Sequence, residues 1–354
     1  MASAPHGPNE PPPPGPRHDA ARQRQMRSIS FIEKEAFTIM THLRSNILNC
    51  IGNTSLLTLR NIAPANGARI LLKIESENPT GSMKDRMALA MIEAAEADGR
   101  LAPNGPVVEY TGGSTGVSLA LVCAVKRHPL HIVTSDAFAR EKLDHMRILG
   151  AKLKVLHSDS GRMTEKLTRD MIAAAGVIAA ETGSFWTDQM KNTDQLAAYH
   201  RLAEEIWTGT GRCIDGFVQS VGTAASLRGT GEALRRLHPA ISVVAVEPAE
   251  SAVLSGGPPG AHKIDGIGAG FVVPLWQKGL ADRIETVSTQ DANAMALRLA
   301  REEGIFAGTS TGANVIAALR QAERLGRGST VVSVMCDTGM KYLKNFATQV
   351  EAEA

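Results

Sequence analysis

Short apolar runs alternate with longer helix-forming segments along the chain that follows Cys50. The apolar runs are expected strands at Ile70–Ile74, Val107–Tyr110, His131–Thr134, Lys154–Leu156, Phe217–Gln219, Val243–Val246, Ile284–Val287 and Val331–Met335. Between them we expect helices at Val117–Lys126, Ala139–Leu149, Gly161–Ala180, Gln195–Trp207, Ala224–Leu237, Ala292–Glu303 and Ala313–Leu325. This alternation is typical of β-α units on a mostly parallel sheet. Because 354 residues can bury a large core, we predict an α/β fold with two lobes.

Composition and charge exclude several classes of protein. The net charge is +2 with both signs interspersed, which indicates no nucleic-acid or membrane partner. No apolar run reaches the roughly 18 residues needed to span a bilayer. The four cysteines form no C-x-x-C pair and the ten histidines show no ligand spacing, so neither a metal site nor a disulfide framework is expected. These features fit a soluble protein of a reducing compartment, and we predict a cytoplasmic location.

Residues 1–45 differ in composition from the rest. They are rich in proline and poor in apolar residues, which predicts a disordered extension that the chemistry does not need. An arginine-containing stretch precedes the amphipathic-looking segment Ile29 to Met40, as in organelle transit peptides, but four acidic residues in the same region are atypical of such peptides. A targeting segment, a regulatory tail and an over-long start therefore remain open.

A Pro/Gly turn places a lysine at the start of a helix. Pro79 and Gly81 interrupt the strand-like run, and the residues from Met87 to Ala97 are almost all helix formers, so a helix should begin near Ser82. The positive end of the helix dipole disfavours a cation at Lys84 by roughly 0.3–1 kcal/mol. If Lys84 also lies in a cleft, both effects favour a neutral amine that can act as a nucleophile or base. Taken alone, Lys84 would more simply be a solvated lysine paired with Asp85.

Three further turns lie where a strand is followed by a helix, which is where open α/β sheets bind ligands. Thr111–Gly116 follows one strand, and its glycines and helix N-terminus could bind a carboxylate. Val221–Ser226 could cradle a phosphate with backbone N–H groups and two hydroxyls. Ala307–Ala313 leads into the last expected helix. Each turn taken alone is equally compatible with a purely structural role.

The combination of these motifs resembles the cysteine synthase family. The segment Asn78 to Arg86 is similar to the lysine motif of O-acetylserine sulfhydrylases and their cystathionine β-synthase relatives, which are fold type II pyridoxal-phosphate enzymes related to the tryptophan synthase β-subunit. The segment His262–Phe271 is similar to a loop that borders the cofactor in the sulfhydrylases. The resemblance runs in order from about Ile51 to Tyr342.

The resemblance implies a role for each turn. Lys84 would bind pyridoxal 5′-phosphate as a Schiff base and act as the catalytic base. The cofactor would also contact Ser114 and, through its ring nitrogen, Ser310. The phosphate would be bound by Gly222, Thr223, Ala224, Ala225 and Ser226. The substrate would be bound by Thr111, Gly112, Gly113, Thr115, Trp186 and Gly266.

The motifs depart from the family pattern at several positions. Gly112 and Ser114 replace a serine and an asparagine of the T-S-G-N-T-G loop, and Trp186 stands where a glutamine helps to bind the substrate carboxylate. Ala224 and Ala225 replace two glycines of the phosphate turn, which can still bind phosphate if both alanines are helical rather than left-handed. We therefore expect a reshaped pocket.

The resemblance implies β-replacement on an O-activated L-serine, in which O-acetyl-L-serine and sulfide give L-cysteine and acetate through an α-aminoacrylate. A hydroxyl at Ser310 does not keep the ring nitrogen protonated, which favours loss of a β-substituent over transamination. The resemblance also implies a homodimer. In each subunit a large cofactor lobe would comprise 46–78 and 190–350, and a smaller mobile lobe would comprise 79–189. Alternatives are condensation with homocysteine, β-elimination, and a non-catalytic cofactor-binding regulator.

Overall fold

The computed structural model describes residue 1 and residues 43–353 except 160, 162 and 163. The chain divides into two units, residues 1–46 and 47–354, and the description below concerns the second. The predicted disordered extension at 1–45 lies almost entirely outside the described residues. Among the residues that the structure describes, no helix combines the length and apolar character needed to cross a bilayer.

The second unit contains two sheets. The larger has the strand order β1-β2-β10-β7-β8-β9 and is parallel except for β1, which pairs antiparallel with β2. Its strands are β1 (Leu56–Thr58), β2 (Arg69–Ile74), β7 (Gly216–Ser220), β8 (Ser242–Pro248), β9 (Arg283–Val287) and β10 (Thr330–Met335). The smaller sheet is parallel throughout, with the order β5-β4-β3-β6. Its strands are β3 (Val107–Tyr110), β4 (Leu130–Ser135), β5 (Lys152–Leu156) and β6 (Phe185–Trp186).

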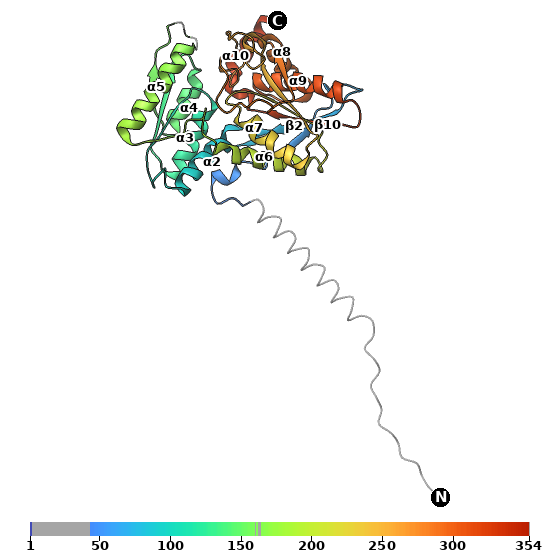
Figure 1. Ribbon diagram of the computed structural model, residues 1–354, viewed down its shortest axis with the longest axis horizontal. Coiled ribbons are helices and arrows are strands. Elements are labelled where there is room, and N and C mark those ends of the chain that lie inside the picture. Colours follow the sequence, from blue (N-terminus) through green and yellow to red (C-terminus); the bar gives the residue numbers. More distant parts are fainter. Residues whose placement is uncertain (2–42, 160, 162–163, 354) are drawn as a thin grey trace. The chain divides into compact units, whose positions relative to one another are not determined.

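Helices connect and cover the parallel strands. They are α2 (Lys84–Ala97), α3 (Ser114–Lys126), α4 (Arg140–Ile148), α5 (Glu165–Thr182), α6 (Gln195–Gly209), α7 (Ala225–Leu237), α8 (Thr289–Arg298), α9 (Thr309–Leu325) and α10 (Leu343–Glu353). Figure 1 shows α3, α4 and α5 with the smaller sheet, while α8 and α9 lie with the larger one. The smaller sheet takes all its strands from residues 79–189 and the larger takes its strands from outside them. The predicted lobe boundaries themselves stay a prediction.

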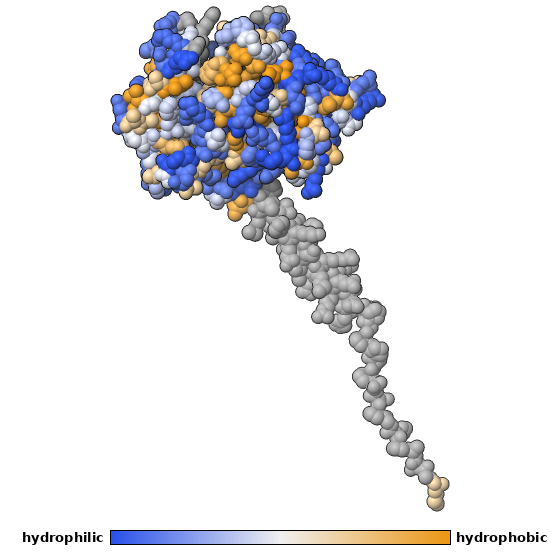
Figure 2. Space-filling model, in the orientation of Figure 1, coloured by the Kyte–Doolittle hydropathy of each residue, from blue (hydrophilic) through white to orange (hydrophobic). Residues whose placement is uncertain are grey.

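Burial on both faces explains why the central strands are rich in apolar residues. Every residue of β3, β7 and β10 is buried, as expected where helices cover both faces of a parallel sheet. The largest cluster of buried apolar side chains includes residues of α2, α3, α6 and α7, and a second cluster packs α9 against the larger sheet. In Figure 2 hydrophilic residues dominate the visible face, with apolar patches between them.

The predicted strands and helices are all present, with shifted ends. The helix α9 begins at Thr309 rather than at Ala313, which places Ser310 inside its first turn. The segment expected to be helical as far as Glu303 continues from α8 as a π-helix over Leu299–Glu303. The strands β1 and β6 and the helix α10 were not predicted. Four short 3₁₀ segments complete the description at Ile47–Cys50, Glu75–Glu77, Ala249–Ser251 and Gly339–Tyr342.

Candidate functional site

The lysine turn is attached to the segment that follows β10. Lys84 is the first residue of α2, and the preceding Met83 donates its N–H to the carbonyl of Cys336 at 2.9 Å. Gly81 accepts from the N–H of Thr338 at 3.0 Å and has a φ of +72°, a conformation that glycine adopts without strain. A Cβ at Gly81 would also lie 2.7 Å from the Thr338 methyl group. The sequence therefore needs glycine here to hold the start of α2 against the end of β10.

The same segment holds the turn that carries Ser310. Gly308 donates its N–H to the carbonyl of Asp337 at 3.2 Å, and Ala307 forms a β-bridge with Thr338. Segment 336–338 therefore contacts the lysine turn and the Ser310 turn simultaneously. This is the structural reason why two motifs far apart in the sequence come together.

Cys336 shows how close the two motifs are. Burial raises the pKa of its thiol, while the charge of Lys84 and a hydrogen bond with Ser310 act against that rise. The pKa of one buried thiol therefore responds to residues of both turns. Cys336 was not predicted as a site residue, because a lone cysteine at the end of a strand carries no distinctive signal.

Ser114 connects the predicted carboxylate turn to the segment that follows β10. It is the first residue of α3, and its hydroxyl donates to Asp337 Oδ2 at 3.3 Å and accepts from Lys341 Nζ at 3.1 Å. Asp337 Oδ2 also accepts from the hydroxyl of Tyr342 at 2.7 Å. The structure therefore brings Ser114 next to the residues that hold Lys84 and Ser310.

The rest of the carboxylate turn is closely packed. Thr111 Oγ1 accepts from the N–H of Gly113 at 3.2 Å, and Thr115 Oγ1 donates to Gln189 Oε1 at 2.8 Å. The ring of Phe138 covers Gly112 so closely that a Cβ there would lie 1.8 Å from the ring. Phe138 therefore occupies the space that a side chain at Gly112 would need.

The structure places Trp186 in an apolar cluster beside α5. Its ring packs near Gly176 of α5 and joins an apolar cluster with Val108 and Met171. The amide that contacts the turn belongs to Gln189, whose side-chain nitrogen also donates to the carbonyl of Tyr110 at 3.1 Å. Gln189 was not predicted as a site residue, because the family motif was aligned so that Trp186 took the place of the glutamine. The sequence does contain this glutamine three residues after Trp186.

The predicted phosphate turn lies between β7 and α7. Gly222, Thr223 and Ser226 are partly exposed, and Ala225 donates its N–H to Thr223 Oγ1 at 3.4 Å. Ala225 meets the condition of a helical conformation, but Ala224 does not, because it has a φ of +69° and lies in the left-handed region. The backbone turns sharply into α7 at this residue. A left-handed conformation is strained for alanine, which has a Cβ, and the family has glycine at this position.

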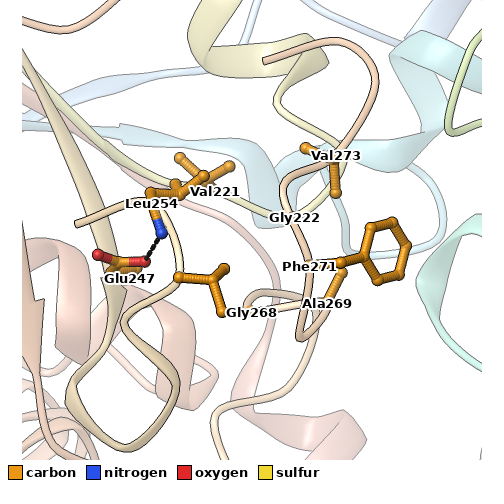
Figure 3. A pocket seen from close by; sticks show the side chains of 9 residues that line it. Val221, Gly222, Glu247, Leu254, Gly268, Ala269, Phe271 and Val273 are labelled. Atoms are coloured by element: carbon orange, nitrogen blue, oxygen red, sulfur yellow. Dashed lines mark hydrogen bonds between the residues drawn. The ribbon is translucent and has the colours of Figure 1, made fainter. Parts of the chain in front are cut away.

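The glycine-rich loop packs against this turn. Gly268 donates its N–H to the carbonyl of Val221 at 3.0 Å, and a Cβ at Gly222 would lie 2.4 Å from the carbonyl oxygen of Gly266. Figure 3 shows residues of both segments lining one small pocket, in which Glu247 accepts a hydrogen bond from the N–H of Leu254. The predicted contact residue Gly266 therefore borders the predicted phosphate turn.

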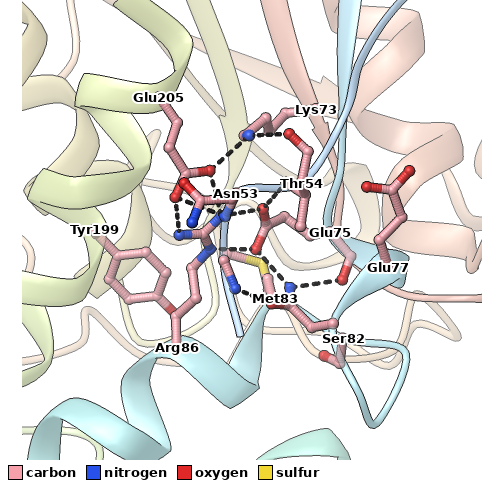
Figure 4. A network of polar contacts seen from close by, with 12 residues as sticks. Asn53, Thr54, Lys73, Glu75, Glu77, Ser82, Met83, Arg86, Tyr199 and Glu205 are labelled. Carbon is pink, nitrogen blue, oxygen red and sulfur yellow. Dashed lines mark hydrogen bonds and ion pairs between the residues drawn. The ribbon is translucent and has the colours of Figure 1, made fainter. Parts of the chain in front are cut away.

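A buried ion network surrounds Arg86 in the first turn of α2 (Figure 4). Arg86 donates two hydrogen bonds to Glu75 at 2.6 and 2.8 Å and two to Glu205, both at 2.7 Å. Lys73 Nζ lies 2.7 Å from the second carboxylate oxygen of Glu205. Burial alone would raise the pKa of Glu205, but the hydrogen bonds and charges of Arg86 and Lys73 lower it to about 2.

The residues present fit pyridoxal phosphate. The amine, the hydroxyl of Ser310 and the backbone N–H groups of the 222–226 turn are the groups that its aldehyde, ring nitrogen and phosphate require. Gln219, whose amide lies 3.5 Å from the sulfur of Met83, connects the end of β7 to the lysine turn. Gln219 Oε1 and Asp337 Oδ1 are buried without a hydrogen-bond partner among the described residues, which leaves them available to a polar ligand.

Comparisons with known proteins agree with this geometry. Residues 47–337 match the family model described as pyridoxal-phosphate dependent enzyme. A cysteine synthase from Staphylococcus aureus is 40% identical over 303 residues, covering 84% of this chain and 95% of that protein. The crystal structure of O-acetyl serine sulfhydrylase isoform 3 from Entamoeba histolytica superposes with a TM-score of 0.81 and 37% identity, covering 86% of this chain and 91% of that one.

A third relative is the O-acetylserine dependent cystathionine beta-synthase from Helicobacter pylori. Its structure superposes with a TM-score of 0.79 and 32% identity, covering 85% of this chain and 98% of that chain. The residues matched by the family model include every strand of both sheets. The chain therefore belongs to the fold type II family of pyridoxal-phosphate-dependent enzymes that contains the cysteine synthases.

Proposed function

We propose that the protein is a cysteine synthase that converts O-acetyl-L-serine and sulfide into L-cysteine and acetate. The observation that carries this proposal is the meeting of Lys84, Ser310 and Ser114 around segment 336–338. The cysteine synthase and the O-acetyl serine sulfhydrylase named above support the choice of substrates. We also propose that the protein is cytoplasmic and forms a homodimer. Light scattering on the purified protein tests whether it is a dimer.

Each turn has a defined task in the proposed reaction. Lys84 would bind the cofactor, the N–H groups of residues 222–226 would bind its phosphate, and Ser310 would face its ring nitrogen. The α-carboxylate of the substrate would bind at Thr111, Gly112, Gly113 and Thr115, with Gln189 orienting the Thr115 hydroxyl. When bound, pyridoxal phosphate withdraws electrons from Cα, so that the α-proton becomes acidic and a β-substituent can leave.

Lys84 would carry the proton in both halves of the reaction. Its amine removes the proton from Cα of the donor, and the acetate leaves Cβ with the bonding electron pair. Sulfide then supplies the electrons of the new C–S bond, and Lys84 returns the proton to Cα. The hydroxyl of Ser310 favours this outcome, because unlike a carboxylate it does not hold the ring nitrogen protonated.

The test compares the wild type with Lys84→Ala. The wild-type holoenzyme should show the visible absorbance of lysine-bound cofactor and form cysteine from O-acetyl-L-serine and sulfide. The Lys84→Ala protein should lose both, with an activity loss of at least about a thousandfold, while Lys191→Ala on the surface should lose neither. Cofactor binding without product from any donor would instead indicate a non-catalytic regulator.

Condensation with homocysteine is the second candidate, because the relative from Helicobacter pylori is named as a cystathionine β-synthase that depends on O-acetylserine. Incubating the enzyme with O-acetyl-L-serine and sulfide, homocysteine or no nucleophile separates the candidates by product. Cysteine supports the proposal, cystathionine the second candidate, and pyruvate with ammonia a β-elimination.

A further inference from the structure

A second pocket opens beside Ser114, the one predicted cofactor contact in its lining. It has a volume of about 270 Å³. It is lined by Thr80, Ser114, Val117, Glu141, Lys142, His145, Thr338, Met340 and Lys341. Its lining contains Ser114 but none of Lys84, Ser310 and the phosphate turn. The pocket therefore adjoins the proposed substrate site without being the place of the cofactor. We call it the Lys142/Lys341 pocket.

Two lysines of this pocket have weak counter-charges. Lys142 is 8% exposed, and its nearest carboxylate is that of Asp265, at 3.6 Å and half exposed. Its ammonium group also lies 4.4 Å from the centre of the Tyr342 ring. Lys341 donates to Ser114, and in the described part of the chain no carboxylate oxygen lies within 4.0 Å of its ammonium group. Lys142 is buried with only a half-exposed carboxylate as its counter-charge, and Lys341 is half-buried with none that close, so an anion in the pocket would supply a counter-charge to both.

The surrounding charges shift the pKa of Lys341 in both directions. Burial lowers the pKa of Lys341, and the positive charges of Lys142 and Lys84 add to that change. The carboxylates of Asp337 and Asp85 oppose it. Both are already engaged: Asp337 accepts from Tyr342 and Ser114, and Asp85 accepts from Thr80 and Ser118. Accepting these hydrogen bonds does not remove the charge of a carboxylate, so the two acids offset part of the positive charge around Lys341.

The other polar groups suit an oxyanion. Thr338 Oγ1 accepts from the N–H of Met340 at 3.3 Å, which leaves its hydrogen to donate into the pocket. His145 lies on the same helix as Lys142, one turn later, and burial lowers its pKa, with the charge of Lys341 adding to the effect. Glu141 is the acidic lining residue, and it is exposed to solvent.

We propose that the Lys142/Lys341 pocket binds a second oxyanion of a substrate, in addition to the α-carboxylate at the 111–115 turn. This oxyanion is either the phosphate of an O-phosphorylated serine donor or the carboxylate of a thiol acceptor. Both are small groups with two or three charge-bearing oxygens, which two ammonium groups bind well. The inference rests on the proposed function and extends it, because it assigns the pocket to a donor or acceptor of the same β-replacement that carries a second charged group, which O-acetyl-L-serine and sulfide lack.

The first experiment needs no turnover. Inorganic phosphate is titrated by calorimetry into the holoenzyme, whose own phosphate turn is filled by the cofactor. We expect the wild type and Lys344→Gln, which changes an exposed lysine nearby, to bind phosphate equally. Lys341→Gln and Lys142→Gln should bind it about 10- to 100-fold more weakly. Equal phosphate affinity in all four proteins, or no binding to the wild type, would overturn the proposal even if the enzyme makes cysteine.

The second experiment identifies the source of the oxyanion by kcat/KM. The donors O-phospho-L-serine and O-acetyl-L-serine are compared with sulfide, and the acceptors mercaptoacetate and 2-mercaptoethanol are compared with O-acetyl-L-serine. Lys341→Gln should lower kcat/KM about tenfold or more for one anionic partner and leave its uncharged counterpart within about twofold. Equal loss with both members of each pair contradicts the proposal. No product from the wild type with any pair would contradict the proposed function instead.

A stability measurement separates binding from a structural role. Because Lys341 lacks a close counter-charge, Lys341→Met should melt at the same temperature as the wild type or higher when phosphate is absent. Phosphate should then raise the melting temperature of the wild type and not that of the variant. A variant that melts well below the wild type without phosphate would show that Lys341 supports the fold and would overturn the assignment.

Discussion

Gly112 and Phe138 illustrate how single positions shape the substrate turn. The turn has glycine where the family has serine, and the Phe138 ring lies where that side chain would project. The two residues are therefore coupled: a small residue at 112 permits an aromatic ring at 138. The sequence showed the unusual glycine but not the ring that makes it necessary, since that contact is made in three dimensions.

The coupling can be tested by substitution. Gly112→Ala should lower the free energy of unfolding by about 1–3 kcal/mol, because its Cβ would lie 1.8 Å from the Phe138 ring and force a rearrangement. Gly113→Ala is the matched control, since no atom lies within 4 Å of its Cβ. Denaturant unfolding measures both. If Gly112→Ala is as stable as the control, or if adding Phe138→Ala recovers nothing, the coupling is absent.

Ala224 carries backbone strain in the proposed phosphate turn. Ala224→Gly should raise the free energy of unfolding by about 1 kcal/mol, because a left-handed residue with a Cβ costs roughly that much. Ala225→Gly, one residue later in the first turn of α7, should instead lower it by up to about 1 kcal/mol. Urea denaturation of the two variants gives opposite signs if the strain is real, and the same sign if it is not.

At the scale of elements, α2 is held by buried ion pairs as well as by its apolar face. Helix propensity predicted that the segment is helical, but it did not indicate the contacts of Arg86 with Glu75 before the helix and with Glu205 on α6. The strands β1 and β6 were not predicted because they are short. They have three and two residues, too few for an alternating pattern to appear.

Arg86→Met tests the role of this network. Removing the guanidinium leaves Glu75, which is fully buried, without its partner, and should lower the free energy of unfolding by about 3–5 kcal/mol. The control is Arg100→Met, whose ion pairs with Asp98 and Asp194 lie nearer the surface and should contribute at most about 1 kcal/mol. Two variants of equal stability in urea would mean that the buried network does not hold α2.

For the whole molecule, the sequence predicted that the turns lie between strands and helices. It did not predict the contacts that bring these turns together. The sequence indicated four strand-to-helix turns and the lysine among them. It did not indicate that residues 336–338 would hold the Lys84 and Ser310 turns together, because hydrogen bonds between distant backbone groups leave no local pattern. It also did not indicate that the ring of Trp186 would pack with residues of α5, and its role in binding substrate stays a prediction.

The pH dependence of global stability should reveal a buried acid in β3. Burial raises the pKa of Glu109 to about 7, although bonds from Thr187, Gln189 and Tyr110 act against that rise. Between pH 4.5 and 7 the folded state therefore binds a proton that the unfolded state has lost, so the free energy of unfolding falls as pH rises, by roughly 3 kcal/mol in all. The fall ends above pH 7, where both states are ionised.

Glu109→Gln removes this titration. Urea denaturation at pH 5 and pH 7.5 should show a smaller decrease with pH for the variant than for the wild type. The difference between the two proteins isolates Glu109 from the other titrating groups. An identical decrease in both would mean that Glu109 is not protonated in the folded protein near neutral pH.

The central claim is that one lysine, Lys84, forms the bond to the cofactor. Three lysines influence one another electrostatically in this region, since the charges of Lys84 and Lys142 both act on Lys341. Reducing the holoenzyme with borohydride fixes the cofactor to its lysine, and peptide mass spectrometry then identifies that residue. We predict the label on Lys84 alone. A label on Lys341, Lys142 or any other lysine would contradict the site described above.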